Sequence, residues 1–76
     1  MNEKLIEYQN ELSALEAWFK DYDSKTSQYQ RHLRIYGKSD IDIADLDYQA
    51  LIKADRIKEL IVLIKEEFET TPSTHI

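Results

Sequence analysis

A regular alternation of three- and four-residue steps runs through the first half of this sequence. Nine of its ten positions are apolar or aromatic, with Thr26 the exception: Leu5, Tyr8, Leu12, Leu15, Phe19, Tyr22, Thr26, Tyr29, Leu33 and Tyr36. Such spacing, kept in phase over five heptads, puts all ten side chains on one face of a helix, as in a coiled-coil seam. The pattern predicts one long amphipathic helix over residues 3–36, about 50 Å long at about 1.5 Å per residue.

One stretch within this helix has low helix propensity. The segment DYDSKTSQ, residues 21–28, contains aspartate, serine and threonine, which favour caps and turns over helix interiors. The seam keeps its phase across the segment, so the sequence favours a continuous helix; a break near residues 23–27 is the alternative. Gly37 follows the last seam residue, where a left-handed C-terminal cap is expected.

A second pattern of three- and four-residue steps occupies the rest of the chain. It predicts a helix over residues 43–69, with these positions facing the first helix: Ile43, Leu46, Ala50, Ala54, Ile57, Ile61, Ile64 and Phe68. Ser39, Asp40 or Asp42 is placed to cap its N-terminus. Residues 70–76, TTPSTHI, have no periodicity and are expected to form a disordered tail.

The expected fold is all-α. The 76 residues contain one glycine and one proline, which are too few turn-forming residues for a sheet or for a fold with several loops. Two long helices joined by a short turn over residues 37–42 must run antiparallel, as a helical hairpin. The whole of residues 1–69 is therefore interpreted as a single domain.

Four aspartates at and just after the turn, Asp40, Asp42, Asp45 and Asp47, resemble the acidic ligands of a calcium-binding loop. An EF-hand loop needs glycine at its sixth position and a bidentate glutamate at its twelfth. Counted from Asp40, those positions hold Asp45 and Leu51, so the match fails. Aspartates at a helix N-terminus also interact favourably with its dipole. We therefore expect Asp42, Asp45 and their neighbours to cap the second helix, and no metal to bind there.

Several function classes find no support in the sequence. Fifteen acidic and ten basic residues give a net charge of −5, which opposes duplex DNA binding, although Lys25, Arg31, Arg34 and Lys38 gather before and within the turn. No phosphate-binding loop, nucleophile motif or metal-ligand spacing is present, and His32 and His75 are isolated. We therefore expect neither enzymatic activity nor a cofactor.

The sequence also suggests where the chain resides. It has no cysteine, its N-terminal residues are polar, and its longest apolar run, LIVLI at residues 60–64, is five residues long. A signal peptide or a membrane span needs a longer apolar segment. We expect a cytoplasmic protein without a membrane-bound part.

The second helix has more apolar residues than one packing face can use. On a helical wheel its surplus falls on the far side, mixed with Asp55 and Glu59, and Trp18 adds a large side chain outside the first seam. A chain of 76 residues has a small core of its own. Association of two hairpins into a four-helix bundle would cover these residues, so the interface candidates are Trp18, Tyr48, Leu51, Ile52, Val62 and Leu63.

Tyrosine recurs along the seam of the first helix, at Tyr8, Tyr22, Tyr29 and Tyr36. The regular spacing favours bulky packing residues whose hydroxyl groups reach the edge of the bundle. The alternative is an aromatic strip that docks a partner, since tyrosine and tryptophan are common in binding hot spots.

One segment resembles a known group of proteins. It contains Trp18, Tyr22 and Asp23, then Gln28, Tyr29 and Arg31, and then the helix start Leu46, Asp47 and Ala50. With this pattern, residues 15–55 resemble small uncharacterised proteins encoded in prophages and mobile elements of Gram-positive bacteria. The resemblance implies a phage or mobile-element origin and no particular activity.

Our leading hypothesis is a non-enzymatic interaction module, a helical dimer that binds another, unidentified protein. The alternative is an acidic decoy that imitates nucleic acid and occupies a host nucleic-acid-binding protein. A third hypothesis, an oligomeric regulator, would place Arg31, Arg34 and Lys38 on DNA. Acids clustered along one exposed face would favour the decoy, whereas an exposed apolar or aromatic patch would favour the interaction module.

Overall fold

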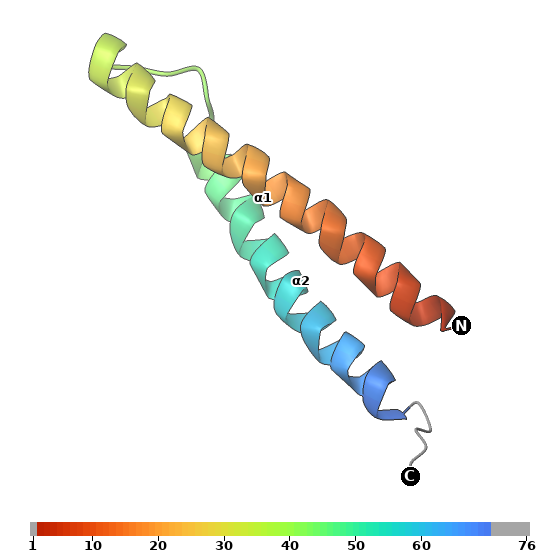
Figure 1. Ribbon diagram of the computed structural model, residues 1–76. Coiled ribbons are helices and arrows are strands. Elements are labelled where there is room, and N and C mark those ends of the chain that lie inside the picture. Colours follow the sequence, from red (N-terminus) through yellow and green to blue (C-terminus); the bar gives the residue numbers. More distant parts are fainter. Residues whose placement is uncertain (1, 71–76) are drawn as a thin grey trace.

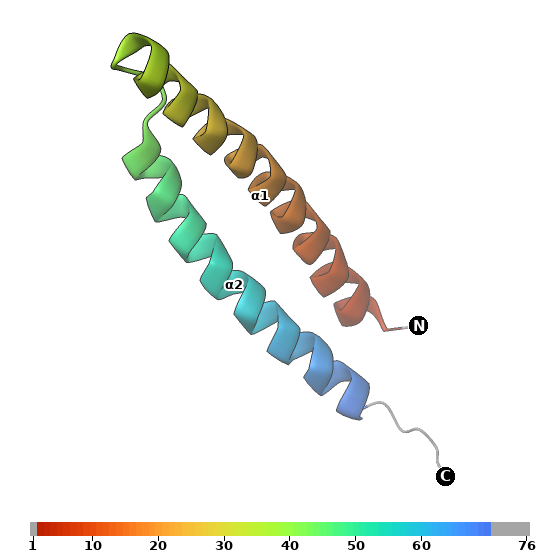
Figure 2. The same cartoon turned by 60° about the vertical axis from the view of Figure 1, so that its left-hand side comes forward.

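The computed structural model describes residues 2–70 and contains two helices, α1 over Glu3–Tyr36 and α2 over Ile43–Thr70. The helices run antiparallel, so α2 ends at the same end of the molecule at which α1 begins (Figure 1, Figure 2). The described residues contain no strand. The expected all-helical hairpin is confirmed, and most of the expected tail, from residue 71 on, lies outside the described residues.

Helix α1 is continuous, and both of its ends are capped. Asn2 caps the N-terminus, where its side chain accepts a hydrogen bond from the Leu5 N–H at 3.2 Å. Gly37 has a left-handed backbone, with φ of 73°, and its N–H donates to the Leu33 carbonyl at 2.9 Å. This is the cap that glycine forms without strain. No break occurs near residues 23–27, where Thr26 keeps its place on the packed face.

Helix α2 is capped by Asp42, one of the three candidates from the sequence. The Asp42 side chain accepts a hydrogen bond from the Asp45 N–H at 3.1 Å, and the Asp42 carbonyl accepts one from the Leu46 N–H. The Asp45 carboxylate accepts a hydrogen bond from the Gln49 side chain at 2.7 Å. The bond from the Asp45 N–H to the Asp42 side chain satisfies a first-turn donor of the kind that a helix N-terminus leaves unpaired.

Contacts between the helices fix their register. Tyr22 contacts Asp47 and Glu11 contacts Arg56, so Ile43, the first residue of α2, lies level with Thr26. The last turns of α1 consequently project beyond the start of α2, and the connecting loop runs back beside them (Figure 1).

The connecting loop is attached to the projecting end of α1. The Ser39 hydroxyl lies 3.0 Å from Nδ1 of His32 and also accepts a hydrogen bond from the Ile41 N–H at 3.2 Å. Leu33 and Tyr36, which continue the heptad pattern of α1, are 40% and 68% exposed. The sequence pattern assigned both residues to the packed face, but α2 begins too late along the hairpin to cover them.

The face of α2 that packs on α1 differs in part from the face expected from apolar spacing. Eight residues at alternating three- and four-residue steps are buried or half-buried, and we call them the inner seam: Ile43, Leu46, Ala50, Lys53, Ile57, Leu60, Ile64 and Glu67. Ile61 and Phe68, which the sequence pattern placed on this face, are 55% and 60% exposed. The inner seam follows a strict heptad only if it includes the polar Lys53 and Glu67, which apolar spacing alone passes over.

Both polar members of the inner seam have partners on α1. The Lys53 ammonium lies 5.2 Å from the centre of the Trp18 ring, and Glu67 accepts a hydrogen bond from the Asn2 side chain at 2.6 Å. A cation over an aromatic face and a paired carboxylate are compatible with partial burial. These contacts explain why charged side chains hold positions that apolar residues hold elsewhere along the seam.

The hairpin has very little enclosed core. Leu60, at 0% exposure, is the one fully buried side chain among the described residues whose burial is resolved. A pair of helices buries only one stripe of each, so every other packed side chain keeps some contact with water. Neither described helix contains a stretch long and apolar enough to cross a membrane.

Candidate interaction surface

The face of α2 opposite the inner seam carries a second heptad pattern. Its eight positions also alternate steps of four and three, and every one is exposed: Ala44, Tyr48, Leu51, Asp55, Lys58, Val62, Lys65 and Glu69. We call these residues the outer seam. Three of its members are large and apolar or aromatic, namely Tyr48 at 64%, Leu51 at 64% and Val62 at 54% exposure. Ile52, 51% exposed, lies at one edge of it.

Two of the six interface candidates lie elsewhere on the hairpin. Trp18 is half-buried, stacks on Tyr22 with ring centres 5.3 Å apart, and meets Phe19 edge-on at 5.0 Å. Leu63 is half-buried at the border of the inner seam. The structure therefore gathers Tyr48, Leu51, Ile52 and Val62 on the outer side of α2, and gives Trp18 and Leu63 a share in the hairpin's own packing.

An ion-pair network holds one flank of α2 to α1. Arg56 forms a bidentate pair with Glu11, with Nε–Oε2 and Nη2–Oε1 distances of 2.5 and 2.8 Å, and it also pairs with Glu59. Hydrogen bonding by Arg56 lowers the pKa of Glu11; burial opposes this shift and the charge of Arg56 adds to it. A planar guanidinium fork fixes orientation as well as distance. The network therefore sets the direction in which α2 presents its outer seam.

A second polar contact lies toward the turn. The Tyr22 hydroxyl donates a hydrogen bond to Oδ1 of Asp47 at 2.6 Å. This bond, with burial and the charge of Asp47 as further contributions, raises the pKa of Tyr22. The Thr26 hydroxyl oxygen is buried and forms no hydrogen bond with any described residue.

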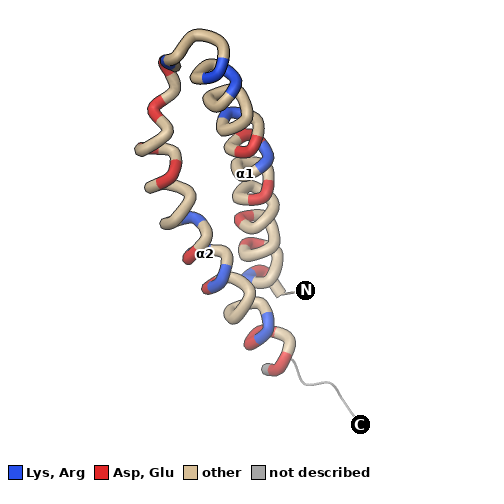
Figure 3. Tube along the Cα trace, turned by 90° about the vertical axis from the view of Figure 1, so that its left-hand side faces the viewer, with Lys and Arg blue, Asp and Glu red and all other residues tan. Residues whose placement is uncertain are grey.

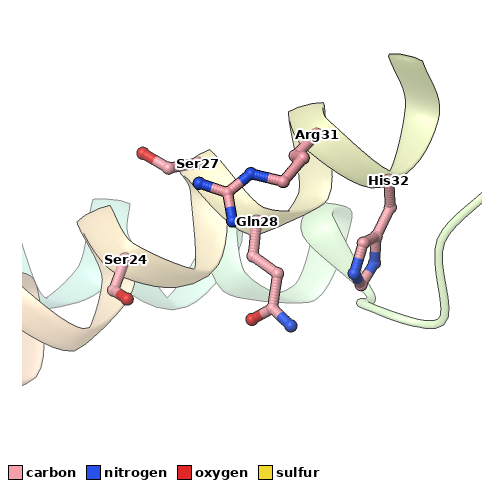
Figure 4. A pocket seen from close by; sticks show the side chains of 5 residues that line it. All are labelled: Ser24, Ser27, Gln28, Arg31 and His32. Carbon is pink, nitrogen blue, oxygen red and sulfur yellow. The ribbon is translucent and has the colours of Figure 1, made fainter. Parts of the chain in front are cut away.

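The projecting end of α1 carries a shallow polar groove of about 410 Å³. It is lined by Ser24, Ser27, Gln28, Arg31 and His32, all from α1, with the Arg31 guanidinium lying over the helix surface (Figure 4). His32 approaches Ser39, but no carboxylate among the described residues hydrogen-bonds the other ring nitrogen of His32. The groove therefore lacks the oriented base that a serine nucleophile requires.

Three of the four aspartates between residues 40 and 47 have partners within the hairpin. Asp42 caps α2, Asp45 binds Gln49 and Asp47 binds Tyr22. Within residues 2–70, no group of three or more histidine, aspartate or glutamate side chains is arranged to hold a metal ion. These aspartates are explained by capping and pairing across the turn.

The sequence carried a signal for the outer seam that apolar spacing did not reveal. Its heptad is interrupted at the centre by Asp55 and Lys58, so a search for apolar positions alone divides it into separate residues.

Comparisons with protein-family models, with curated proteins and with solved structures give no match to this chain. The surface is therefore interpreted from its own chemistry.

Proposed function

We propose that this chain is a non-enzymatic protein–protein interaction module that acts as a homodimer, joined through the outer seam of α2. The observation that supports the proposal is that α2 has apolar residues on two nearly opposite faces, while α1 covers only one of them. A helix that is apolar on two sides is normally buried on two sides. A second hairpin is the simplest cover, because it brings a matching face by symmetry.

The size of the exposed surface is consistent with a modest interface. Complete burial of a valine- or leucine-sized side chain contributes roughly 1.5–3 kcal/mol. Tyr48, Leu51 and Val62 are already partly covered, so each has about half to two-thirds of that contribution left to gain. The free energy gained by burying these side chains on both copies must also exceed the free-energy cost of the translational and rotational entropy lost on association. We therefore expect micromolar rather than nanomolar self-affinity.

The charge pattern gives less support to the acidic decoy. The charged residues in the first turns of α2 are all acidic, but acidic and basic residues are interspersed along the rest of α2, and basic residues gather toward the projecting end of α1 (Figure 3). On the acidic first half of α1, Glu11 is engaged by Arg56. A nucleic-acid mimic needs acids clustered on one exposed face. A DNA-binding regulator is disfavoured in turn by the net charge of −5.

Binding of a further protein belongs to the same proposal. The projecting end of α1 exposes Leu33, Ile35 and Tyr36, and it lies beyond the region in which two copies of α2 would meet. It therefore stays accessible in the dimer. An origin in a phage or mobile element, implied by the resemblance of residues 15–55, would be compatible with a small adaptor of this kind.

The experiment compares two glutamate substitutions at sites of similar exposure. Leu51, in the outer seam, is 64% exposed, and Ile35, on the projecting end, is 60% exposed. Light scattering after size exclusion should show that Leu51→Glu converts the dimer to a monomer, while Ile35→Glu leaves it dimeric. Circular dichroism should show the same helix content in both variants. Dissociation by Ile35→Glu alone would move the interface to the end of α1 and overturn the proposal.

A further inference from the structure

The outer seam has a symmetry of its own that defines how two copies fit together. The order of its three- and four-residue steps is the same in both directions along α2. Two antiparallel copies of α2 can therefore be aligned so that every outer-seam residue of one copy faces an outer-seam residue of the other. In that arrangement Leu51 lies opposite Val62, and Asp55 lies opposite Lys58. Both pairs are centred on the same point, between Arg56 and Ile57. One two-fold axis therefore generates all of these contacts twice.

We propose that two copies pair antiparallel along α2 in this register, with Asp55 of each copy ion-paired to Lys58 of the other. This inference rests on the proposed homodimer and specifies its geometry. Tyr48 then faces Lys65, an aromatic ring beside a cation, and Ala44 faces Glu69. Apolar pairs flank a central charged layer, and opposite charges at such positions fix register and orientation in helix pairs.

Other arrangements of the same face lose these pairings. If one copy slides by a heptad in one direction, Leu51 falls opposite Asp55; if it slides the other way, Leu51 falls opposite Glu69. A parallel pair would set Asp55 against Asp55 and Lys58 against Lys58. Each alternative puts a charge against an apolar residue or against a like charge, and both are unfavourable. The antiparallel register at the proposed axis avoids like-charge pairs, and it sets a charge against an apolar residue only at its two ends, where Ala44 faces Glu69.

The two charges are available for this role. Within the described chain neither Asp55 nor Lys58 takes part in an ion pair, whereas Arg56, between them in the sequence, points to the other flank and is engaged by Glu11 and Glu59. Both residues are exposed on the same side of α2 as Leu51 and Val62. The charge complementarity is therefore directed away from α1, toward the second copy.

Charge exchange tests the central layer. Asp55→Lys and Lys58→Asp each replace two attractive contacts by two repulsive ones, so each variant should weaken self-association about tenfold or more. The double variant restores opposite charges at both contacts and should recover wild-type affinity to within about threefold, measured by sedimentation equilibrium. An equimolar mixture of the two single variants should form heterodimers. A double variant as weak as the single variants would overturn the proposed register.

Cysteine cross-linking tests the orientation, and the natural sequence contains no cysteine that would interfere. Disulfides require Cα atoms about 4.4–6.8 Å apart. A mixture of Leu51→Cys and Val62→Cys chains should, on mild oxidation, form mainly the mixed disulfide, identified by intact mass. Leu51→Cys alone should cross-link poorly. A dominant link between two copies of residue 51 would establish a parallel pair and overturn the inference, while the proposed homodimer would stand.

Two further outcomes separate this inference from the proposed function. A monomeric wild-type chain would overturn both. A dimer that is indifferent to the charge exchanges and forms neither disulfide would overturn the inference and would place the contact on another face. The exposed Ile61 and Phe68 would then be the next residues to substitute.

Discussion

Replacing Leu60 by alanine tests which residues of α2 face α1. Leu60 is fully buried, whereas its neighbour Ile61 is 55% exposed. Leucine-to-alanine substitutions in protein cores cost about 2–5 kcal/mol, and the cost is lowest where the surroundings can collapse or admit water. In a two-helix layer we expect a loss of about 2–3 kcal/mol. Total stability for a chain of this length is about 4–11 kcal/mol, so this loss is a large fraction of it.

The assay is urea unfolding followed by circular dichroism at one fixed chain concentration, because self-association makes stability depend on concentration. Ile35→Ala, at a site 60% exposed, should change the free energy of unfolding by no more than about 0.5 kcal/mol. Ile61→Ala should cost less than about 1 kcal/mol. If Ile61→Ala destabilises the protein as much as Leu60→Ala, then α2 is rotated about its axis so that Ile61 also faces α1, and the outer seam is wrongly placed.

Three further predictions follow from single residues. Thr26→Val should raise the free energy of unfolding by about 1 kcal/mol in the same urea assay, because it removes a buried hydroxyl that forms no hydrogen bond with the described residues; a loss of stability would show that the hydroxyl has a partner. The raised pKa of Tyr22 means that the folded state holds the phenolic proton more tightly. The stability contributed by the Tyr22–Asp47 hydrogen bond is complete below the ordinary tyrosine pKa of about 10 and is lost as the pH rises through the raised pKa. Asp47→Asn should therefore shift the ultraviolet titration of Tyr22 to lower pH. Tyr22→Phe identifies which part of the titration signal belongs to Tyr22. Calorimetry with calcium and with magnesium should show no saturable binding in the ~0.1–10 µM range of sensor sites, and a one-site isotherm would contradict the capping role given to Asp42 and its neighbours.

Much of the hairpin follows from local rules in the sequence. The seam of α1 kept its phase across the weak segment, and Gly37 supplied a cap that requires a positive φ. The choice of Asp42 among three possible caps needed the actual path of the loop, because Ser39 is engaged by His32 instead. Propensity and spacing define helices; they do not define which of several neighbouring polar residues completes an end.

The register of the hairpin and the rotation of α2 depend on contacts between the helices. Lys53 packs toward α1 because its ammonium lies over the Trp18 ring, and Glu67 does so because it accepts a hydrogen bond from Asn2. The spacing of apolar residues does not predict such contacts made by polar side chains. Once both are included, the inner seam is as regular as the seam of α1. The same reasoning applies to the outer seam, where Asp55 and Lys58 separate Tyr48 and Leu51 from Val62. On both faces of α2, the heptad pattern is complete only when its charged residues are counted as members.

The most direct test of the homodimer is the molar mass of the wild-type chain, measured by light scattering together with its thermal melting at several concentrations. We predict a mass that approaches twice 9.0 kDa at concentrations well above the micromolar dissociation constant, and a melting temperature that rises with concentration, because association and folding stabilise one another. A mass of 9.0 kDa, with a cooperative melt at high temperature that is independent of concentration, would contradict it.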